Sequence, residues 1–495
     1  MGYSAKGSHR PLAVLAVTSI LCVVVAAMIN LQGCQTAPAA NFARSFIGPK
    51  AFADATDRFG AAATVRGWGG LAAFDYDNDG DIDLLITNGP GAANALLRND
   101  GQAGFVDVAV QAGVAFVADN CSACAVGDFN NDGWLDLLIG RQKLDVPPGS
   151  PVGSIMLLNN GADGAGNVTF RQVGPAETGL TSEVPGMGFG IGDLDNDGLL
   201  DIVIGRYDIS VISLLLVPIY ESQPNEIWRC TGVISGVPQY QRVQGPNISG
   251  GMQPGFSPDT ANQTFIPGTF VVHLTDVDND GRLDIFYLHD IPGGIDYLHN
   301  DGNMAFSFRQ QDILNLHGGW MGIAGGDYDG DADIDYFITN VGCDFTTSIV
   351  PNTVGSAHLE PDGTFFHKLL RNDAGVLTDI TAATAVAHPG PLPPQNSIGG
   401  GGLTGTEFGF GATWIDTDNR GLLDLYWTGD LITFIQRGIV FNSHGVGRFL
   451  ENAGNGSFVE QTAERGLFNI QPDRPLAFGE QDAGSRDLME RMVVE

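Results

Sequence analysis

A nine-residue acidic pattern, D-x-[DN]-x-D-G-x-x-D, recurs along this chain and is followed each time by an apolar run. Its copies begin at residues 75, 128, 193, 276, 327 and 416, so successive copies lie 51 to 89 residues apart. Five copies keep an oxygen-bearing side chain at positions 1, 3, 5 and 9, and the sixth has Arg420 at position 5. A pattern repeated at this spacing indicates an array of similar structural units, with extra residues in the longer intervals.

Each unit also contains a Gly-rich apolar segment before the acidic loop and a paired segment after it. Examples of the first are 68–74, 186–192 and 409–415, and examples of the second are 96–114, 297–314, 369–386 and 449–467. The paired segments have Asn, Asp and Gly at their centres, which is typical of strand, turn and strand. One unit is therefore expected to be four short strands, and such units in series predict an all-β fold, a β-propeller.

The number of blades depends on the two ends of the chain. Residues 52–60 resemble the last strand of a unit, and residues 476–488 resemble a degraded Gly-rich strand with its acidic loop. We expect these two segments to close a seventh blade, with six blades as the alternative.

The acidic loops have the chemistry of a site for a hard cation. Alternating side-chain oxygens in a tight loop suit Ca²⁺, which takes 6–8 oxygen ligands, and Gly at position 6 permits the sharp turn. An EF-hand would need Glu at position 12 and a helix beyond it, but position 12 is Ile86 in the first copy and the residues that follow favour a strand. We therefore expect calcium loops placed between two strands of a blade.

The loops, their Gly-rich leads and the hairpins resemble the FG-GAP/VCBS repeats of integrin α-subunit propellers and of many bacterial surface proteins, over about residues 51–490. The resemblance implies about five bound Ca²⁺ ions. The ligands that it implies are Asp75, Asp77, Asp79 and Asp83; Asp128, Asn130, Asp132 and Asp136; Asp193, Asp195, Asp197 and Asp201; Asp276, Asp278, Asp280 and Asp284; and Asp327, Asp329, Asp331 and Asp335. Ala332 replaces the turn Gly of the fifth loop, which leaves its affinity open, and Arg420 predicts that the sixth loop holds no metal.

The first 33 residues are expected to be a signal peptide of the lipoprotein type. Lys6 and Arg10 precede the apolar stretch 11–31, and Cys34 follows in the sequence LQGC, which resembles a lipobox whose Cys is lipidated. Ordinary cleavage near residues 37–40 and an uncleaved anchor are the alternatives. All of these place the protein outside the cytoplasm, either at the cell surface or secreted. The protein is expected to contact the membrane only through its N-terminus, and residues 34–50 are expected to be a linker.

Charge excludes one class of partner. Asp and Glu number 57 against 24 Lys and Arg, giving a net charge of −33, whereas nucleic-acid binding needs basic patches. The pair Cys121 and Cys124 is a candidate disulfide, with plain buried cysteines as the alternative.

No GxSxG, HExxH or Walker motif is present, so a non-enzymatic propeller that binds a protein or a glycan is the expected function. Its specificity is expected in two insertions, at about 207–269 and 341–408 of the propeller domain 51–495. A polysaccharide lyase-like carbohydrate-active enzyme and a purely structural envelope component are the alternatives. The ligand itself and the oligomeric state are left open by the sequence.

Overall fold

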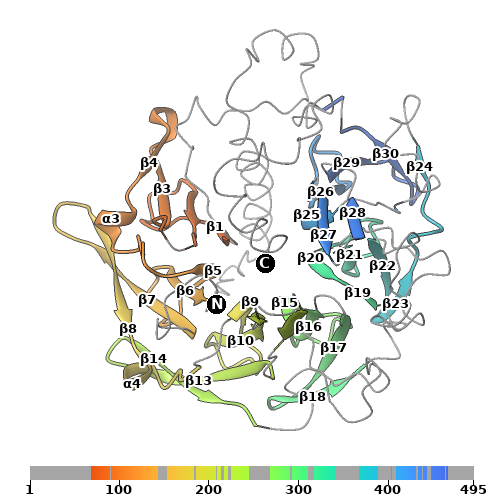
Figure 1. Ribbon diagram of the computed structural model, residues 1–495. Coiled ribbons are helices and arrows are strands. Elements are labelled where there is room, and N and C mark those ends of the chain that lie inside the picture. The colour runs from red at the N-terminus through yellow and green to blue at the C-terminus, as the bar shows by residue number, and fades with distance from the viewer. Residues whose placement is uncertain are drawn as a thin grey trace, which may run out of the picture.

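The fold is an all-β propeller, seen along its axis in Figure 1. The computed structural model describes residues 69–465 with internal gaps, of which the longest are 143–152, 245–267, 341–366 and 388–402. The described residues form six sheets in which four strands follow one another in chain order and neighbouring strands are antiparallel. The first strand of each sheet lies nearest the axis.

The strands of the first three blades have the following bounds. They are β1 (Leu71–Phe74), β2 (Asp83–Ile86), β3 (Ala95–Asn99) and β4 (Phe105–Asp107); β5 (Cys121–Gly127), β6 (Asp136–Arg141), β7 (Gly153–Ala162) and β8 (Val168–Val173); and β9 (Gly186–Gly192), β10 (Asp201–Arg206), β13 (Glu226–Ile234) and β14 (Val237–Arg242). Helical structure in these blades is limited to the short segments η2 (Gly101–Ala103), α3 (Ala109–Ala112) and α4 (Pro175–Thr178) of the described chain.

The other three blades follow the same plan with small additions. Their strands are β15 (Thr269–Thr275), β16 (Asp284–His289), β17 (Gly293–Gly302) and β18 (Ala305–Phe308), with β19 (His317–Gly318) beside β17; β20 (Trp320–Gly326), β21 (Asp335–Asn340), β22 (Lys368–Asp373) and β23 (Val376–Asp379); and β25 (Phe408–Ile415), β26 (Asp424–Asp430), β29 (Gly447–Asn452) and β30 (Phe458–Glu460). The short strand β24 (Val386–Ala387) pairs in parallel with β30. The chain thus links the fifth blade to the outer edge of the sixth before it returns to the axis.

The blade count is six among the described residues, which is the alternative stated above and not the preferred seven. Both segments that a seventh blade would need, 52–60 and 476–488, lie outside the described residues. The prediction of seven blades rested on these two segments alone.

The core consists of apolar layers between consecutive blades. Leu85 of β2 and Leu137 of β6 belong to one buried cluster, and Val203 of β10 and Ile285 of β16 belong to another. The second strand of every blade is an almost continuous apolar run because neighbouring blades cover both of its faces. The repeated apolar run after each acidic loop is therefore the centre of the core.

Glycine in the first strands permits the blades to approach closely at the axis. A Cβ on Gly322 of β20 would lie 2.1 Å from the backbone oxygen of Phe410 in β25, and one on Gly188 of β9 would lie 2.8 Å from the backbone nitrogen of Val272 in β15. The Gly-rich segments identified in the sequence are thus the innermost strands, as expected.

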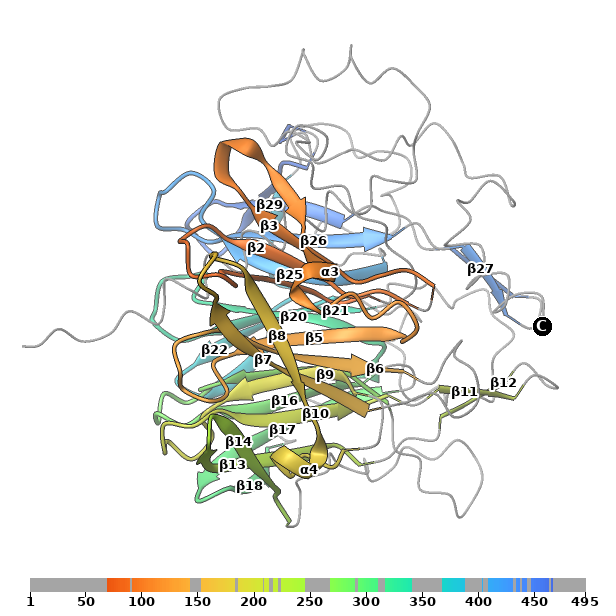
Figure 2. The same ribbon diagram turned by 90° about the vertical axis from the view of Figure 1, so that its left-hand side faces the viewer.

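The insertions do not span the whole of 207–269 and 341–408, because both ranges contain outer blade strands. The first includes β13 and β14, and the second includes β22 and β23. Extra chain instead enters between strands, as in the hairpins β11 (Ile209–Ile212) with β12 (Val217–Tyr220) and β27 (Thr433–Gln436) with β28 (Ile439–Asn442). Figure 2 shows β11, β12 and β27 standing away from the blades on one side of the propeller.

Candidate metal centres

The acidic loops join the first and second strands of each blade and therefore share one face of the propeller. In the first loop, Asp75 accepts hydrogen bonds from the backbone N–H groups of Asp79 (3.1 Å) and Gly80 (3.0 Å). The equivalent aspartate makes the same two contacts in the other five loops, the degenerate sixth included. The position-1 aspartate thus fixes the shape of the turn even where no metal is expected.

The turn requires left-handed backbone at position 6. Gly80, Gly133, Gly198, Gly281 and Gly421 have φ between +79° and +94°, and Ala332 of the fifth loop has φ +78°. Because Ala332 still donates its N–H to Asp327 (3.1 Å), the fifth loop keeps the shape of the others at the cost of backbone strain.

The aspartate at position 9 is fully buried and joins three parts of its blade. Asp83 accepts hydrogen bonds from the N–H of Tyr76 in the loop (3.0 Å) and of Asn99 at the end of β3 (2.7 Å). Burial raises the pKa of Asp83 to about 7. It raises the pKa of the equivalent aspartates of three other loops to about the same value, namely Asp136, Asp201 and Asp335. Their ionised form therefore lacks compensating charge within the protein.

Position 3 offers a buried carboxylate oxygen that a cation could contact. The Oδ1 atoms of Asp77 and Asp195 are buried and have no hydrogen-bond partner. Burial and the charges of Asp79 and Asp75 raise the pKa of Asp77. A divalent cation would both accept the free oxygen lone pair and offset the repulsion, so the donor set fits a metal ion.

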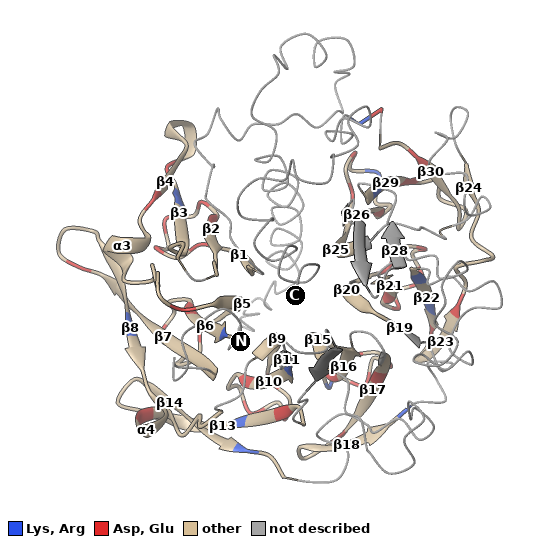
Figure 3. Ribbon diagram, in the orientation of Figure 1, with Lys and Arg blue, Asp and Glu red and all other residues tan. Residues whose placement is uncertain are grey.

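Four loops bring together three potential ligand atoms within 4.8 Å of one another. The groups contain Asp75, Asp77 and Asp83; Asp193, Asp195 and Asp197; Asp278, Asp280 and His299; and Asp327, Asp329 and Asp335. The other expected ligands of these loops, Asp79, Asp201, Asp276, Asp284 and Asp331, lie outside the groups. Acidic residues recur around the ring while Lys and Arg are few (Figure 3).

Loop two does not form such a group of three carboxylates. Its Asn130 side chain donates to Asp132 (2.8 Å), while Asp128 holds the turn and Asp136 holds the loop to β7. The amide oxygen of Asn130 accepts from the N–H of Asp132 (3.1 Å). All four expected ligands of this loop therefore keep the loop closed.

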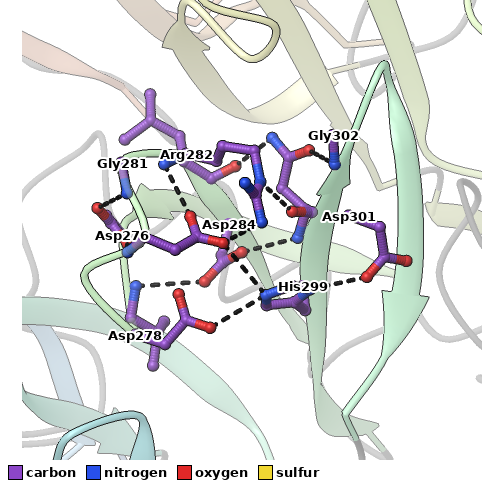
Figure 4. Close-up of polar contacts among 12 residues, drawn as sticks. Asp276, Asp278, Gly281, Arg282, Asp284, His299, Asp301 and Gly302 are labelled. Carbon is purple, nitrogen blue, oxygen red and sulfur yellow. Dashed lines mark hydrogen bonds and ion pairs between the residues drawn. The ribbon is translucent and has the colours of Figure 1, made fainter.

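Three loops contain an internal cation, and in the fourth it is Arg282, which pairs with Asp280 (Figure 4). In the third, Arg229 on β13 lies 2.5 Å from Asp195 and 3.0 Å from Asp197. In the sixth, Arg420 pairs with Asp418 at 2.6 Å and with Glu451 on β29 at 3.3 Å. Within its loop Arg420 thus pairs chiefly with Asp418, since Asp424 is 3.9 Å away.

The sequence prediction missed a set of asparagines that join the blades. Four asparagines lie in the last part of the third strand of their blades, and each donates its side-chain amide to the position-2 carbonyl of the preceding blade at 2.8–2.9 Å. They are Asn159, Asn300, Asn372 and Asn452. The asparagines at position 4 of loops one to three similarly donate to the next loop, as Asn78 does to the carbonyl of Gly133 (3.1 Å). The Asn of the repeated hairpin sequence was the available signal, and it was assigned only to the turn.

The structure does not support a disulfide within the pair Cys121 and Cys124. Both residues lie on β5, where Cys121 faces Arg141 and Cys124 faces Ile139 across the ladder, and neither forms a disulfide. Residues three apart on a strand are separated by about 10 Å, beyond the roughly 7 Å limit for the Cα atoms of a disulfide. The alternative of plain cysteines holds for these two.

A buried row of polar side chains lies at the opposite end of the fourth blade. The hydroxyl of Thr269 is 3.0 Å from Nδ1 of His289, whose Nε2 is 2.9 Å from Asp296. All three side chains are at most 2% exposed, so they join β15, β16 and β17 within the blade and present no reactive atom at the surface.

The N-terminal predictions fall outside the described residues. These are the signal peptide 1–33, the lipidated Cys34 and the linker 34–50. Within the described part of the chain, no helix has the length and apolar character needed to cross a bilayer.

Taken together, the fold and its loops define a β-propeller with repeated acidic loops. The FG-GAP-like repeat matches residues 48–139 and 276–338, so the chain contains FG-GAP-like repeats in the segments that hold the first, second, fourth and fifth loops. A search of curated proteins found no significant match.

Several solved structures are similar to this chain at low identity. One is an Agrocybe aegerita lectin that recognises non-reducing terminal N-acetylglucosamine (15% identity, TM-score 0.41, 81% of this chain and 80% of that chain covered). Another is a thermostable family-43 glycoside hydrolase (11%, TM-score 0.30, 67% and 96%). A third is the V. cholerae biofilm matrix protein Bap1 (12%, TM-score 0.30, 63% and 38%).

Proposed function

We propose that this protein is a calcium-stabilised, non-enzymatic propeller that binds a protein or a glycan outside the cytoplasm. The observation that carries the proposal is the buried Oδ1 of Asp77, which has no hydrogen-bond partner, beside Asp75 and Asp83, which accept backbone hydrogen bonds of the same loop. A loop with several carboxylates and a buried oxygen left over has the donor set of a Ca²⁺ site.

Calcium would be held in loops one to five by the aspartates and Asn130 that the repeat supplies. The bound ion would supply positive charge between the loop carboxylates. The chain itself already joins the loop to the blade through Asp83 and Asn99. Neutralising the charge on the buried Asp83 would therefore stabilise the junction between the loop, β2 and β3.

Ligand binding is proposed for the face opposite the acidic loops. Each acidic loop ends at the start of a second strand, as at Asp201 of β10, and the hairpin β11–β12 begins beyond the far end of that strand. The hairpin β27–β28 follows β26 in the same way, and Figure 2 shows both additions on one side. Loops carried on a rigid scaffold are common binding elements.

The surroundings of the protein are proposed from its N-terminal sequence. The apolar stretch 11–31 followed by Cys34 supports a cell-surface lipoprotein, with a secreted form as the alternative. The membrane would then be reached through the N-terminus alone. The high negative charge supports the absence of a nucleic-acid partner.

Binding to a glycan array by the calcium-loaded full chain tests the proposal against its alternatives. The proposal predicts saturable binding to a defined glycan or protein, without shortening of the polymer. A fall in polymer viscosity or new unsaturated ends would establish a carbohydrate-active enzyme instead. An absence of binding to glycans and envelope proteins, together with a weakened envelope when the gene is deleted, would establish a structural component.

A further inference from the structure

One largely buried arginine lies at the end of the second blade that is opposite its acidic loop. Arg141 is the last residue of β6, whose first residue, Asp136, closes the loop. The side chain of Arg141 is 14% exposed, and its ion pair within the described part of the chain is with Asp119, at 4.0 Å. Its buried Nε has no hydrogen-bond partner among the described residues. A guanidinium so far out of water is costly unless an anion pairs with it closely.

The equivalent position is closely paired in four other blades. There, a side chain from the beginning of the third strand, or just before it, contacts the polar residue at or just beyond the end of the second strand. The pairs are Asn94 with Asn88 (2.8 Å), Glu226 with Arg206 (2.6 Å), Asp296 with His289 (2.9 Å) and His367 with Asn340 (2.9 Å). In the second blade, Gly153 of β7 lies opposite Arg141 in the ladder and offers no side chain. Among the described residues, Arg141 therefore lacks the partner that the other blades supply.

A second buried donor lies at the same end of this blade. Ser122 is the extra residue of a bulge in β5, between Cys121, which lies opposite Arg141, and Ala123. Ser122 is 5% exposed, and its hydroxyl has no hydrogen-bond partner in the described part of the chain. A guanidinium and a hydroxyl both donate to oxyanions.

Asp119 is the charged group that opposes an anion at this place. Its distance of 4.0 Å from Arg141 exceeds the roughly 2.7–2.9 Å of a charge-assisted hydrogen bond. Asp119 therefore offsets part of the charge of Arg141 and leaves the Nε donor available. An external carboxylate would be repelled by Asp119 and held by Arg141.

We propose that Arg141 and Ser122 bind a carboxylate of an acidic glycan. The inference rests on the proposed function and names the class of ligand for the face opposite the acidic loops. The planar guanidinium binds a carboxylate through two parallel hydrogen bonds, which gives it a preference over a neutral sugar. Both donors lie at the end of one blade, so the site suits a single carboxylate on a narrow sugar chain.

The test is a calorimetric titration of the calcium-loaded full chain with a glucuronate-containing tetrasaccharide. The matched ligand is the same tetrasaccharide with its carboxylates reduced to alcohols. We expect the acidic form to bind at least about 10-fold more tightly than the reduced form. Arg141→Gln should weaken binding of the acidic form about 10- to 100-fold, Ser122→Ala should weaken it several-fold, and Asp119→Asn should strengthen it.

Arg242→Gln is the matched control variant. Arg242 ends β14 at the same face, is 42% exposed and pairs with Glu226 (3.3 Å), so its loss changes the net charge equally and should leave binding unchanged. In the absence of glycan, Arg141→Gln should melt at the same temperature as wild type or higher, because it removes a buried charge without a close partner. A lower melting temperature together with unchanged glycan binding would show that Asp119 alone is the partner of Arg141.

Equal affinity of wild type and Arg141→Gln for the acidic form, or no binding of that form to wild type, would overturn the inference. Binding that survives in Arg141→Gln and disappears without Ca²⁺ would place the carboxylate at the acidic loops and also overturn it. Binding of an acidic peptide instead, lost in Arg141→Gln, would assign the site to a protein partner. Equal binding of the acidic and reduced forms would remove the inference and leave the proposed function standing, whereas failure of that function appears as no binding to any glycan or protein.

Discussion

Asn372, at the end of the third strand of the fifth blade, donates its side-chain amide to the backbone carbonyl of Val277 in the fourth blade at 2.8 Å. It also donates to the carbonyl of Ile334 (3.2 Å), and its own N–H binds the buried Asp335 (2.9 Å). One side chain thus connects two blades and the base of an acidic loop. The blades are joined by directional contacts as well as by apolar layers.

Replacing Asn372 with Ala should destabilise the propeller by about 2–4 kcal/mol, because two buried carbonyls lose their donor. Urea unfolding would measure the change. Asn160→Ala is the matched control, since the amide of Asn160 makes an exposed hydrogen bond to Thr169 and its loss should cost less than about 0.5 kcal/mol. If the two variants lowered the free energy of unfolding equally, the hydrogen bond between the blades would contribute no more to stability than an exposed one.

Replacing Ala332 with Gly should stabilise the protein by about 1 kcal/mol, because Ala332 has a left-handed φ of +78° that Gly adopts without strain. The reverse change in loop two, Gly133→Ala, should destabilise by a similar amount, although its Cβ would meet no atom within 4 Å. Thermal unfolding of both variants checks the pair. A destabilised Ala332→Gly would mean that the turn at this position is not strained.

Stability of the metal-free protein should fall as the pH rises from about 5 to 7.5. The pKa of Asp83, Asp136, Asp201 and Asp335 is raised to about 7 from an ordinary value near 4, so the folded chain holds more protons than the unfolded chain between these values. Deprotonation in this range therefore favours unfolding. Calcium should reverse the trend, because the bound ion favours the ionised carboxylates.

Melting temperatures of metal-stripped and calcium-loaded protein across this pH range check the prediction. The prediction fails if the stripped protein becomes steadily more stable toward pH 7.5.

Replacing Asp77 with Asn should remove one calcium equivalent and leave the metal-free melting temperature equal or higher. The change removes a partly buried charge that is repelled by Asp75 and Asp79. At a calcium concentration of 100 Kd the lost site is worth about 2.7 kcal/mol. Isothermal titration calorimetry gives the number of sites.

Asp418→Asn is the control for this variant. Asp418 has the same position in loop six but pairs with Arg420, so the number of calcium sites should not change. Loss of a calcium equivalent in Asp418→Asn would show that loop six binds metal and that Arg420 does not exclude it.

The sequence predicts the repeated elements of this fold well, because each element leaves a local signature. The Gly-rich innermost strands, the apolar second strands and the acidic loops all lie where their residue types place them. The contacts between blades, such as Asn372 with Val277, depend on residues 95 positions apart and have no local signature. The pairing of Arg229 and His299 with their loops was missed for the same reason.

The blade count and the insertions were predicted less well, because outer strands vary more than inner ones. Strand β13 lacks the hairpin Asn and has Cys230 in its place, so its segment was assigned to an insertion. The segment β22–β23 was assigned to both an insertion and a hairpin. The length of a repeat alone does not distinguish an inserted segment from a blade strand with an atypical sequence.

The most direct test of the account is the melting temperature of the full chain before and after removal of bound metal. Several calcium sites, each worth about 2–3 kcal/mol when saturated, should together raise it by about 10 °C or more. We predict that the melting temperature falls by this amount on chelation, and that Ca²⁺ restores it whereas Mg²⁺ does not. An unchanged melting temperature, in protein shown by elemental analysis to be free of metal, would contradict the account.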